Sequence, residues 1–191
     1  MSRYDDELWE LVPEEREPAP AEVVDFVRAL GRAERALDLG GGDGRLAGEI
    51  DAGEVTVADV SAVALDRARR RLPGARVALL VPDAPLPFED SSFDLVLCAH
   101  VVDHVRDVQL FLSEVRRVLR PGGRVAVVTF AYGRRTGIDV LARGFERRFD
   151  PLSPHLRFYT RRSLSRLLRT MGFGVTSTRR RRGRLLALAT R

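Results

Sequence analysis

Cysteine is nearly absent from this chain, whose 191 residues include only Cys98. A single cysteine excludes an internal disulfide and a cysteine-rich metal cage. No apolar run approaches the roughly 20 residues that a membrane-spanning helix needs. The acidic N-terminus also has no apolar segment of the kind that signal peptides carry. We therefore expect a cytoplasmic protein with no metal and no membrane partner.

Lysine and asparagine are absent altogether, and all 32 basic residues are arginine. Both missing residue types have AT-rich codons, so this pattern indicates a GC-rich genome. The net charge of +5 is also typical of proteins that bind nucleic acid, and the arginine-rich residues 179–184 are the obvious candidate contact. They lie between two predicted strands, where a solvated charged turn protects a sheet edge. A nucleic-acid partner is therefore the minor alternative.

The order of apolar runs and turn residues predicts an α/β domain over residues 21–191, preceded by an acidic, loosely attached arm over residues 1–20. Strands are predicted at 36–39, 55–58, 76–81, 93–98, 125–130, 173–177 and 185–189, and helices at 21–31, 44–51, 61–72, 107–119 and 161–171. Such alternation makes a parallel sheet with helices on both faces. The last two strands are too closely spaced for a crossover, so they close the sheet as an antiparallel hairpin.

The segment Asp38-Leu39-Gly40-Gly41-Gly42-Asp43-Gly44 places an acid and a glycine turn at the end of a predicted strand. Glycines permit positive φ and close approach of a ligand, which is typical of a nucleotide-binding corner. Asp38 would repel a pyrophosphate and attract a cationic amino group, while Asp59 ends the next strand, where an acid bonds ribose hydroxyls. A ribose with a cation and no phosphate points to S-adenosylmethionine. The alternative is a nicotinamide dinucleotide, because residues 42–47 fit the glycine–x–glycine–x–x–alanine fingerprint. Asp38 and Asp43 disfavour it, because they would place two negative charges near the pyrophosphate.

Several ordered motifs extend this interpretation along the chain. They are residues 38–44, Asp59-Val60-Ser61, Asp83-Ala84 with Leu86-Pro87-Phe88, Phe93-Asp94 with residues 100–105, residues 117–123, and residues 155–160 with Met171-Gly172-Phe173. Together they cover residues 36–190 and resemble the class I S-adenosylmethionine-dependent methyltransferases, in particular their compact methyltransferase-domain group.

This resemblance implies a Rossmann-like, seven-stranded, mostly parallel sheet with the cofactor across the carboxyl ends of strands one, two and four. It assigns the cofactor's amino group to Asp38, the ribose to Asp59, and the adenine edge to Asp83 and Ala84. The full set of cofactor-binding residues is Asp38, Gly40, Gly42, Gly44, Asp59, Val60, Asp83, Ala84 and Ala99. The stretch from Asp83 to Phe88 is shorter than usual in the family, which weakens the adenine assignment.

No catalytic triad is expected, because an activated methyl donor mainly needs alignment and exclusion of water. His100, at the exit of the fourth strand, is the leading general base, with a structural role equally open, and His155 and Tyr159 are expected to line the acceptor pocket. His100 and His104 have the spacing of two metal ligands on a helix, but no third ligand accompanies them. Residues 131–160 are expected to form a substrate lid or, alternatively, a solvated segment.

These interpretations predict a methyltransferase that transfers a methyl group in line to a small-molecule acceptor. The alternatives are an RNA methyltransferase and a non-catalytic regulatory domain that binds S-adenosylmethionine. The role of Asp94, near the start of the fourth strand, stays open between a structural hydrogen bond and a substrate contact.

Overall fold

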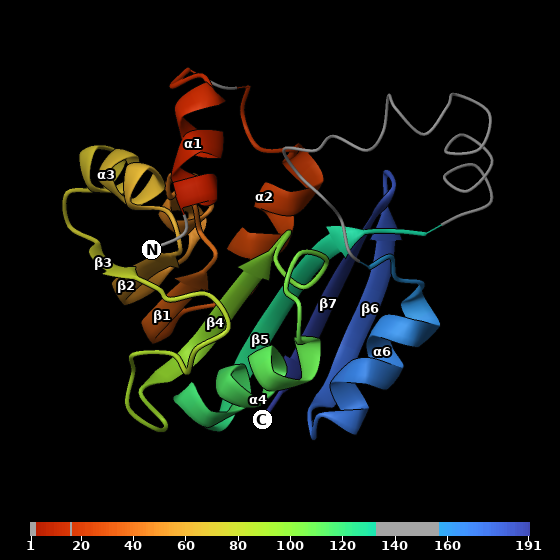
Figure 1. The fold of residues 1–191 in the computed structure, drawn as a ribbon. Helices are drawn as coiled ribbons and strands as arrows, with labels where there is room; N and C mark the ends of the chain where they lie inside the picture. Colours follow the sequence, from red (N-terminus) through yellow and green to blue (C-terminus); the bar gives the residue numbers. More distant parts are fainter. Residues whose placement is uncertain (1–2, 16, 133–156) are drawn as a thin grey trace, which may run out of the picture.

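The computed structural model describes residues 3–15, 17–132 and 157–191. Its centre is a seven-stranded sheet in the order β3-β2-β1-β4-β5-β7-β6 (Figure 1). The strands are β1 (Ala33–Leu39), β2 (Ala52–Asp59), β3 (Arg76–Leu79), β4 (Phe93–Ala99), β5 (Leu119–Phe130), β6 (Gly174–Arg181) and β7 (Arg184–Thr190). The helices are α1 (Arg3–Leu11), α2 (Ala21–Arg28), the 3₁₀ helix η1 (Ala47–Glu49), α3 (Ala62–Arg71), α4 (Val108–Val118) and α6 (Arg161–Thr170).

The first five strands run parallel, and only β7 is antiparallel to its neighbours β5 and β6. The predicted α/β fold with a terminal antiparallel hairpin is therefore confirmed. The hairpin turn is shorter than expected, since β6 continues to Arg181 and only Arg182 and Gly183 connect the strands. Both residues have positive φ, of 41° and 82°, as a two-residue turn between twisted antiparallel strands requires.

One predicted helix is wrong. Residues 44–51 form no α-helix, and only the single turn η1 (Ala47–Glu49) is helical. Gly44 has a φ of 76°, which an α-helix cannot contain, and Gly48 further lowers the helix propensity of this short segment. The chain therefore passes from the glycine-rich turn to β2 almost directly.

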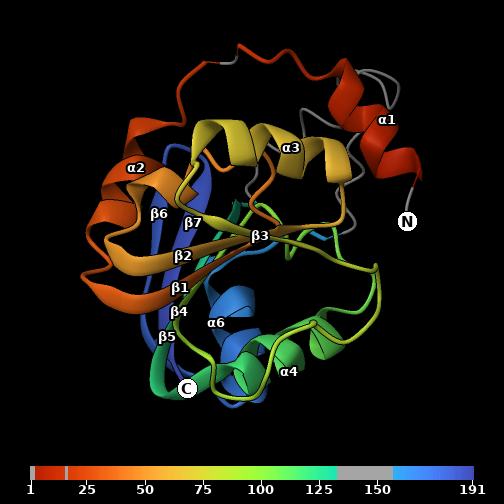
Figure 2. The same ribbon diagram turned by 90° about the vertical axis from the view of Figure 1, so that its left-hand side faces the viewer.

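The core consists of apolar layers on the two faces of the sheet. Helices α4 and α6 cover one face, where Leu112 and Leu164 pack among strand residues such as Val96. Helix α2 covers the other, where Val27 packs with Leu97, and Figure 2 shows α2 and α6 on opposite sides of the strands. Because neighbouring residues of β4 point to opposite faces and both sets are buried, the strand is apolar from Leu95 to Ala99. None of the helices in the described part of the chain has the length and apolarity that a bilayer crossing demands.

Asp94 ties three strands together at the amino end of the sheet. Its carboxylate accepts hydrogen bonds from the backbone N–H groups of Glu34, at 2.8 Å, and Arg35, at 2.9 Å, and pairs with Arg120 at 2.6 Å. Partial burial raises the pKa of Asp94, but these N–H groups and Arg120 outweigh it and hold the pKa below its usual range. This edge is opposite the carboxyl ends of the parallel strands, so the structural role is the one that the geometry supports.

We expect Asp94→Ala to lower the free energy of unfolding by about 2 kcal/mol, because it removes two charge-assisted hydrogen bonds that join β1 to β4. Chemical denaturation measures this loss. Asp90→Ala serves as the control, since the Asp90 carboxylate is 78% exposed and pairs with Arg117 at the surface, where an ion pair contributes under about 1 kcal/mol. Equal effects of the two substitutions would contradict the structural assignment.

Candidate active site

The carboxyl end of β1 continues into the glycine turn (residues 38–44). Gly40, Gly42 and Gly44 have positive φ values of 72°, 56° and 76°, so this turn needs residues without a side chain. The N–H of Gly40 donates to the carbonyl of Ala58 at 2.7 Å, which fastens the turn to the neighbouring end of β2. The backbone of the turn thus lies at the edge where the parallel strands end.

Asp59, the last residue of β2, is bonded to the same turn. Its carboxylate accepts the N–H of Gly42 at 2.9 Å and the N–H of Ser61 at 3.0 Å, and the residue is only 7% exposed. Burial raises the pKa of Asp59, and the two N–H groups oppose this effect. Asp59 therefore joins the glycine turn to the start of α3, at the strand end to which the resemblance assigns the ribose.

Asp38 is buried beside this arrangement and lacks a hydrogen-bond partner. The residue is 1% exposed, and neither carboxylate oxygen has a partner of ordinary geometry among the described residues. Burial, followed by the nearby carboxylate of Asp59, raises the pKa of Asp38 from 3.8 to about 7, and the N–H of Ala47 offsets only part of this. Burying an acid without a partner is costly, so a cationic ligand group at this point would be strongly favoured.

Helix α1 lies over the glycine turn, which corrects the expectation of a loosely attached arm. A Cβ placed on Gly42 would lie 2.5 Å from the indole of Trp9, so the ring packs directly on the Gly42 backbone. Asp6 accepts a hydrogen bond from the Ser61 hydroxyl at 2.7 Å, and Arg67 donates to the carbonyl of Val12 at 2.7 Å. The arm is therefore docked on α3 and forms one wall of the site (Figure 2).

His100 follows β4 at the same edge of the sheet. Its φ is 58°, a left-handed conformation that histidine tolerates better than most residues, and its N–H donates to the carbonyl of Val128 at 2.8 Å. The imidazole faces the ring of Phe130, with centroids 4.7 Å apart. The next side chain, Val101, packs against Gly40, where an added Cβ would be 2.4 Å from it. The exits of β1 and β4 therefore meet at this point.

Of the other two predicted catalytic residues, Tyr159 is buried and His155 lies outside the described residues. Tyr159 is buried, with 6% exposure, and its hydroxyl donates to the carbonyl of Val102 at 3.2 Å. Burial raises the pKa of Tyr159. This placement gives Tyr159 a packing role behind the loop that follows His100, and its catalytic assignment remains a prediction that the geometry does not favour. His155 and most of the predicted lid over residues 131–160 lie outside the described residues.

The remaining cofactor assignments lie along the same edge. Val60 and Ala99 are half-buried and directly follow or end β2 and β4. Asp83 is exposed, has a φ of 58°, and lies 3.8 Å from Arg106, while Ala84 donates its N–H to the carbonyl of Val81 at 3.3 Å. The adenine assignment of Asp83 and Ala84 stays a prediction.

The histidines near β4 were also considered as metal ligands. His104 lies 3.8 Å from the carboxylate of Asp103. Within residues 3–15, 17–132 and 157–191, no three His, Cys, Asp or Glu side chains gather in a way that could hold a metal ion. Cys98 is fully buried, and burial raises the pKa of its thiol.

Comparison with known proteins identifies the fold. A model of the methyltransferase domain matches residues 37–127, which run from β1 into β5. Residues 37–127 therefore match the methyltransferase domain, and the whole chain has the fold of the class I S-adenosylmethionine-dependent methyltransferases. A solved member of this class from Thermotoga maritima superimposes with a TM-score of 0.70 at 23% identity, covering 87% of this chain and 86% of that one. That likeness concerns the fold.

The sequence relatives of this methyltransferase include enzymes named for quinones. A demethylmenaquinone methyltransferase of Clavibacter sepedonicus is 33% identical over 160 residues, which cover 82% of this chain and 60% of the relative. A ubiquinone/menaquinone biosynthesis C-methyltransferase of Coxiella burnetii is 35% identical over 112 residues, covering 53% of this chain and 45% of the relative. The chain thus spans about half the length of the curated relatives that it matches.

The cofactor of this methyltransferase class is S-adenosylmethionine, and the site fits it. The glycine turn has no side chains at Gly40, Gly42 and Gly44, so a ligand that displaces the covering side chains of Trp9 and Val101 could approach its backbone closely. The buried Asp38 carboxylate would gain a charged partner from the cationic amino group of the cofactor. Asp59 has two oxygens, each of which accepts one hydrogen bond and keeps a lone pair for a ribose hydroxyl. We expect Asp38 to hold the amino group and Asp59 the ribose.

Sequence reasoning missed two parts of this site. No local pattern indicates that the ring of Trp9 would meet Gly42, 33 positions along the chain. Val101 was placed only within a motif, and its contact with Gly40 depends on how β1 and β4 pair. The Val101 contact follows from strand order, and the Trp9 contact follows from the docking of α1 on α3.

We expect Asp59→Ala to weaken the binding of S-adenosylhomocysteine by roughly 1–3 kcal/mol, because charge-assisted hydrogen bonds to the ribose are lost. Isothermal titration calorimetry measures the change. Asp66→Ala, on the exposed side of α3, is the matched control and should bind like the wild type. An unchanged affinity in Asp59→Ala would show that the ribose lies elsewhere.

We also expect the stability of the unliganded protein to fall as the pH rises from about 4 to about 7. The folded state holds the Asp38 proton up to a pKa of about 7, whereas the unfolded chain releases it near 3.8, so the folded state binds more protons in this window. Asp38→Asn removes this pH-dependent contribution to the free energy of unfolding, which is roughly 2–4 kcal/mol. Denaturation at several pH values tests it, and an identical pH profile for the variant would contradict the assignment.

Proposed function

We propose that this protein transfers a methyl group from S-adenosylmethionine to a small, aromatic acceptor of the quinol class. Two independent features support the proposal. The donor side has a buried acid without a cationic partner among the described residues and a glycine turn with positive φ values, and the chain resembles relatives named as quinone C-methyltransferases. The observation that carries the acceptor class is the aromatic surface beside His100.

This aromatic surface consists of Phe130, Tyr132 and Phe158. Phe130 is 37% exposed, Tyr132 50% and Phe158 49%, and the last two rings have centroids 6.4 Å apart. Exposed apolar patches often mark ligand-binding or interaction sites. A flat ring would stack on such a surface at the exit of β5, next to the imidazole of His100.

The chemistry asks little of the protein beyond positioning and one proton transfer. The sulfonium of the cofactor supplies an already activated methyl group. Asp38, Asp59 and the glycine turn orient the donor, and the aromatic surface orients the acceptor ring in line with it. His100 would accept the proton of a quinol hydroxyl, which makes the ring carbon nucleophilic. After the methyl group joins that carbon and S-adenosylhomocysteine leaves, the hydrogen of the carbon would move as a proton to the quinol oxygen and restore the aromatic ring. The ring of Phe130 and the left-handed backbone of His100 hold the imidazole in place for this transfer.

The direct test of the function is turnover of methyl-labelled S-adenosylmethionine with a short-chain naphthoquinol. We expect a labelled ring-methylated product. Transfer to RNA instead, with no product from the quinol, would overturn the acceptor class. Binding of the cofactor with no turnover on any acceptor would favour a regulatory domain.

We expect His100→Gln to lower kcat by about 10²–10⁴-fold, the usual contribution of a positioned general base. The affinity for S-adenosylhomocysteine should remain within about twofold, because the imidazole does not form the donor site. His104→Gln is the matched control, since His104 lies one turn further along the same loop. Equal losses in both variants would mean that His100 has only a structural role.

A further inference from the structure

The charges of this chain are distributed unevenly along its length. Residues 151–191 contain eleven arginines and no aspartate or glutamate, whereas the first 150 residues contain 21 arginines and all 27 acids. A GC-rich genome explains the choice of arginine over lysine, but it does not explain why the acids stop. The last segment is therefore strongly basic in its own right.

Five of these arginines lie on one surface, formed by α6 and the facing side of the outermost strand β6. This basic edge consists of Arg161, Arg162, Arg166, Arg169 and Arg180, all of them exposed. Arg179 and Arg181 pair with Leu186 and Arg184 and point to the opposite face of the sheet. None of the five has a carboxylate partner among the residues that the structure describes. Elsewhere exposed arginines pair with acids, as do Arg28, Arg32, Arg35, Arg69, Arg70, Arg76, Arg106 and Arg120.

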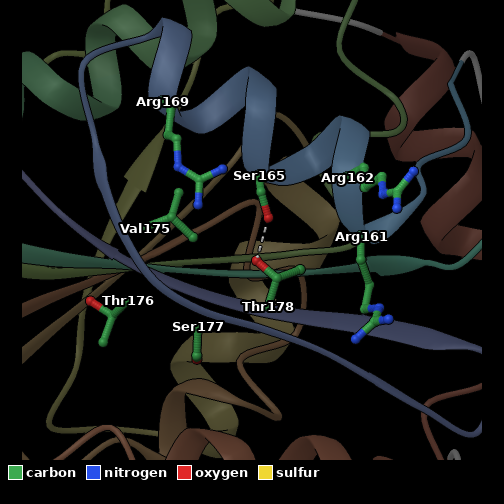
Figure 3. A pocket seen from close by; sticks show the side chains of 8 residues that line it. All are labelled: Arg161, Arg162, Ser165, Arg169, Val175, Thr176, Ser177 and Thr178. Atoms are coloured by element: carbon green, nitrogen blue, oxygen red, sulfur yellow. Dashed lines mark hydrogen bonds between the residues drawn. The ribbon is translucent and has the colours of Figure 1, made fainter.

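The basic edge is shaped by the packing of α6 on β6. Figure 3 shows the arginines of α6 beside β6, with a hydrogen bond of 2.8 Å between Ser165 and Thr178 across the contact. A groove of about 440 Å³ lies between the two elements. A second hollow, of about 320 Å³, is lined by Arg161, Arg162 and Arg180 together with Tyr132. The basic edge therefore reaches Tyr132, whose ring lies against Phe158.

The combination of cations and aromatic rings decides which partner fits. A surface for single-stranded nucleic acid carries aromatic rings between its cations, as stacking platforms for successive bases. Here Tyr132 and Phe158 lie together at one end, and the arginine rows of α6 and β6 carry no rings. Clusters of four to eight cations on an amphipathic helix, with aromatic side chains nearby, are typical of proteins that bind anionic membranes.

We propose that the basic edge docks on a membrane surface rich in anionic phospholipid, with the aromatic surface turned toward the lipid. The expectation of no membrane partner rested on the lack of a spanning segment, which peripheral binding does not need. Docking in this orientation would bring the acceptor side of the methyltransferase to the bilayer, where an apolar quinol dissolves. The inference extends the proposed function, but binding is measured without turnover, so each can fail alone.

The experiment is sedimentation of the full chain with vesicles of phosphatidylglycerol and phosphatidylcholine, and with vesicles of phosphatidylcholine alone. We expect binding only to the anionic vesicles, weakened by salt. The triple variant Arg162→Gln, Arg166→Gln, Arg180→Gln should lose about fivefold in partition coefficient per arginine. The matched control is Arg32→Gln, Arg69→Gln, Arg76→Gln, which removes the same charge from paired surface sites and should retain most of the binding.

Three results would overturn the proposal. These are no binding of the wild type to anionic vesicles, equal losses in the two triple variants, and binding of a single-stranded RNA oligonucleotide with no binding to vesicles. Thermal unfolding of both triple variants ensures that the comparison is between folded proteins. If the protein binds anionic vesicles but methylates no quinol, the membrane-docking proposal is supported and the proposed function is wrong.

Discussion

The arrangement of the site depends on carboxylates that are buried around one glycine turn. Asp38, Asp43 and Asp59 are 1%, 3% and 7% exposed, although ionised groups are costly to bury. Asp43 is paired with Arg45 and Arg71, and Asp59 accepts backbone N–H groups. In the described part of the chain no arginine pairs with Asp38, and the N–H of Ala47 offsets only part of the effect of its burial. A cationic ligand group at the turn would therefore stabilise the buried carboxylate of Asp38.

The proposed donor and acceptor sites occupy different parts of the same sheet edge. The donor side is formed by the ends of β1 and β2 and is closed by α1, whose Trp9 packs on Gly42. The acceptor side is formed by the ends of β4 and β5 and by the start of α6, with its exposed aromatic rings. The arginines of the basic edge lie beside the acceptor side. This division explains why one chain can combine a family-wide donor site with an acceptor surface of its own.

The sequence was most informative where short-range chemistry decides the structure. The glycine turn, the acids that follow β1 and β2, and the terminal hairpin could be predicted, because positive φ, strand ends and short connections leave few alternatives. The helix over residues 44–51 could not, since the conformation of Gly44 depends on the whole turn. The role of Asp94 stayed open because its partners, Glu34 and Arg35, come from a strand about 60 residues earlier. The sequence predicted that Tyr159 lines the acceptor pocket, and only its tertiary contacts reveal a buried packing role.

The central claim is that Asp38 is reserved for the cationic amino group of the cofactor. The most direct measurement compares the affinity of S-adenosylhomocysteine, which has this group, with that of 5′-methylthioadenosine, which lacks it, across the pH range around 7. We expect the preference for S-adenosylhomocysteine to shrink as Asp38 is protonated below its pKa of about 7, while the affinity for 5′-methylthioadenosine changes little. The same pH dependence for both ligands would contradict the account.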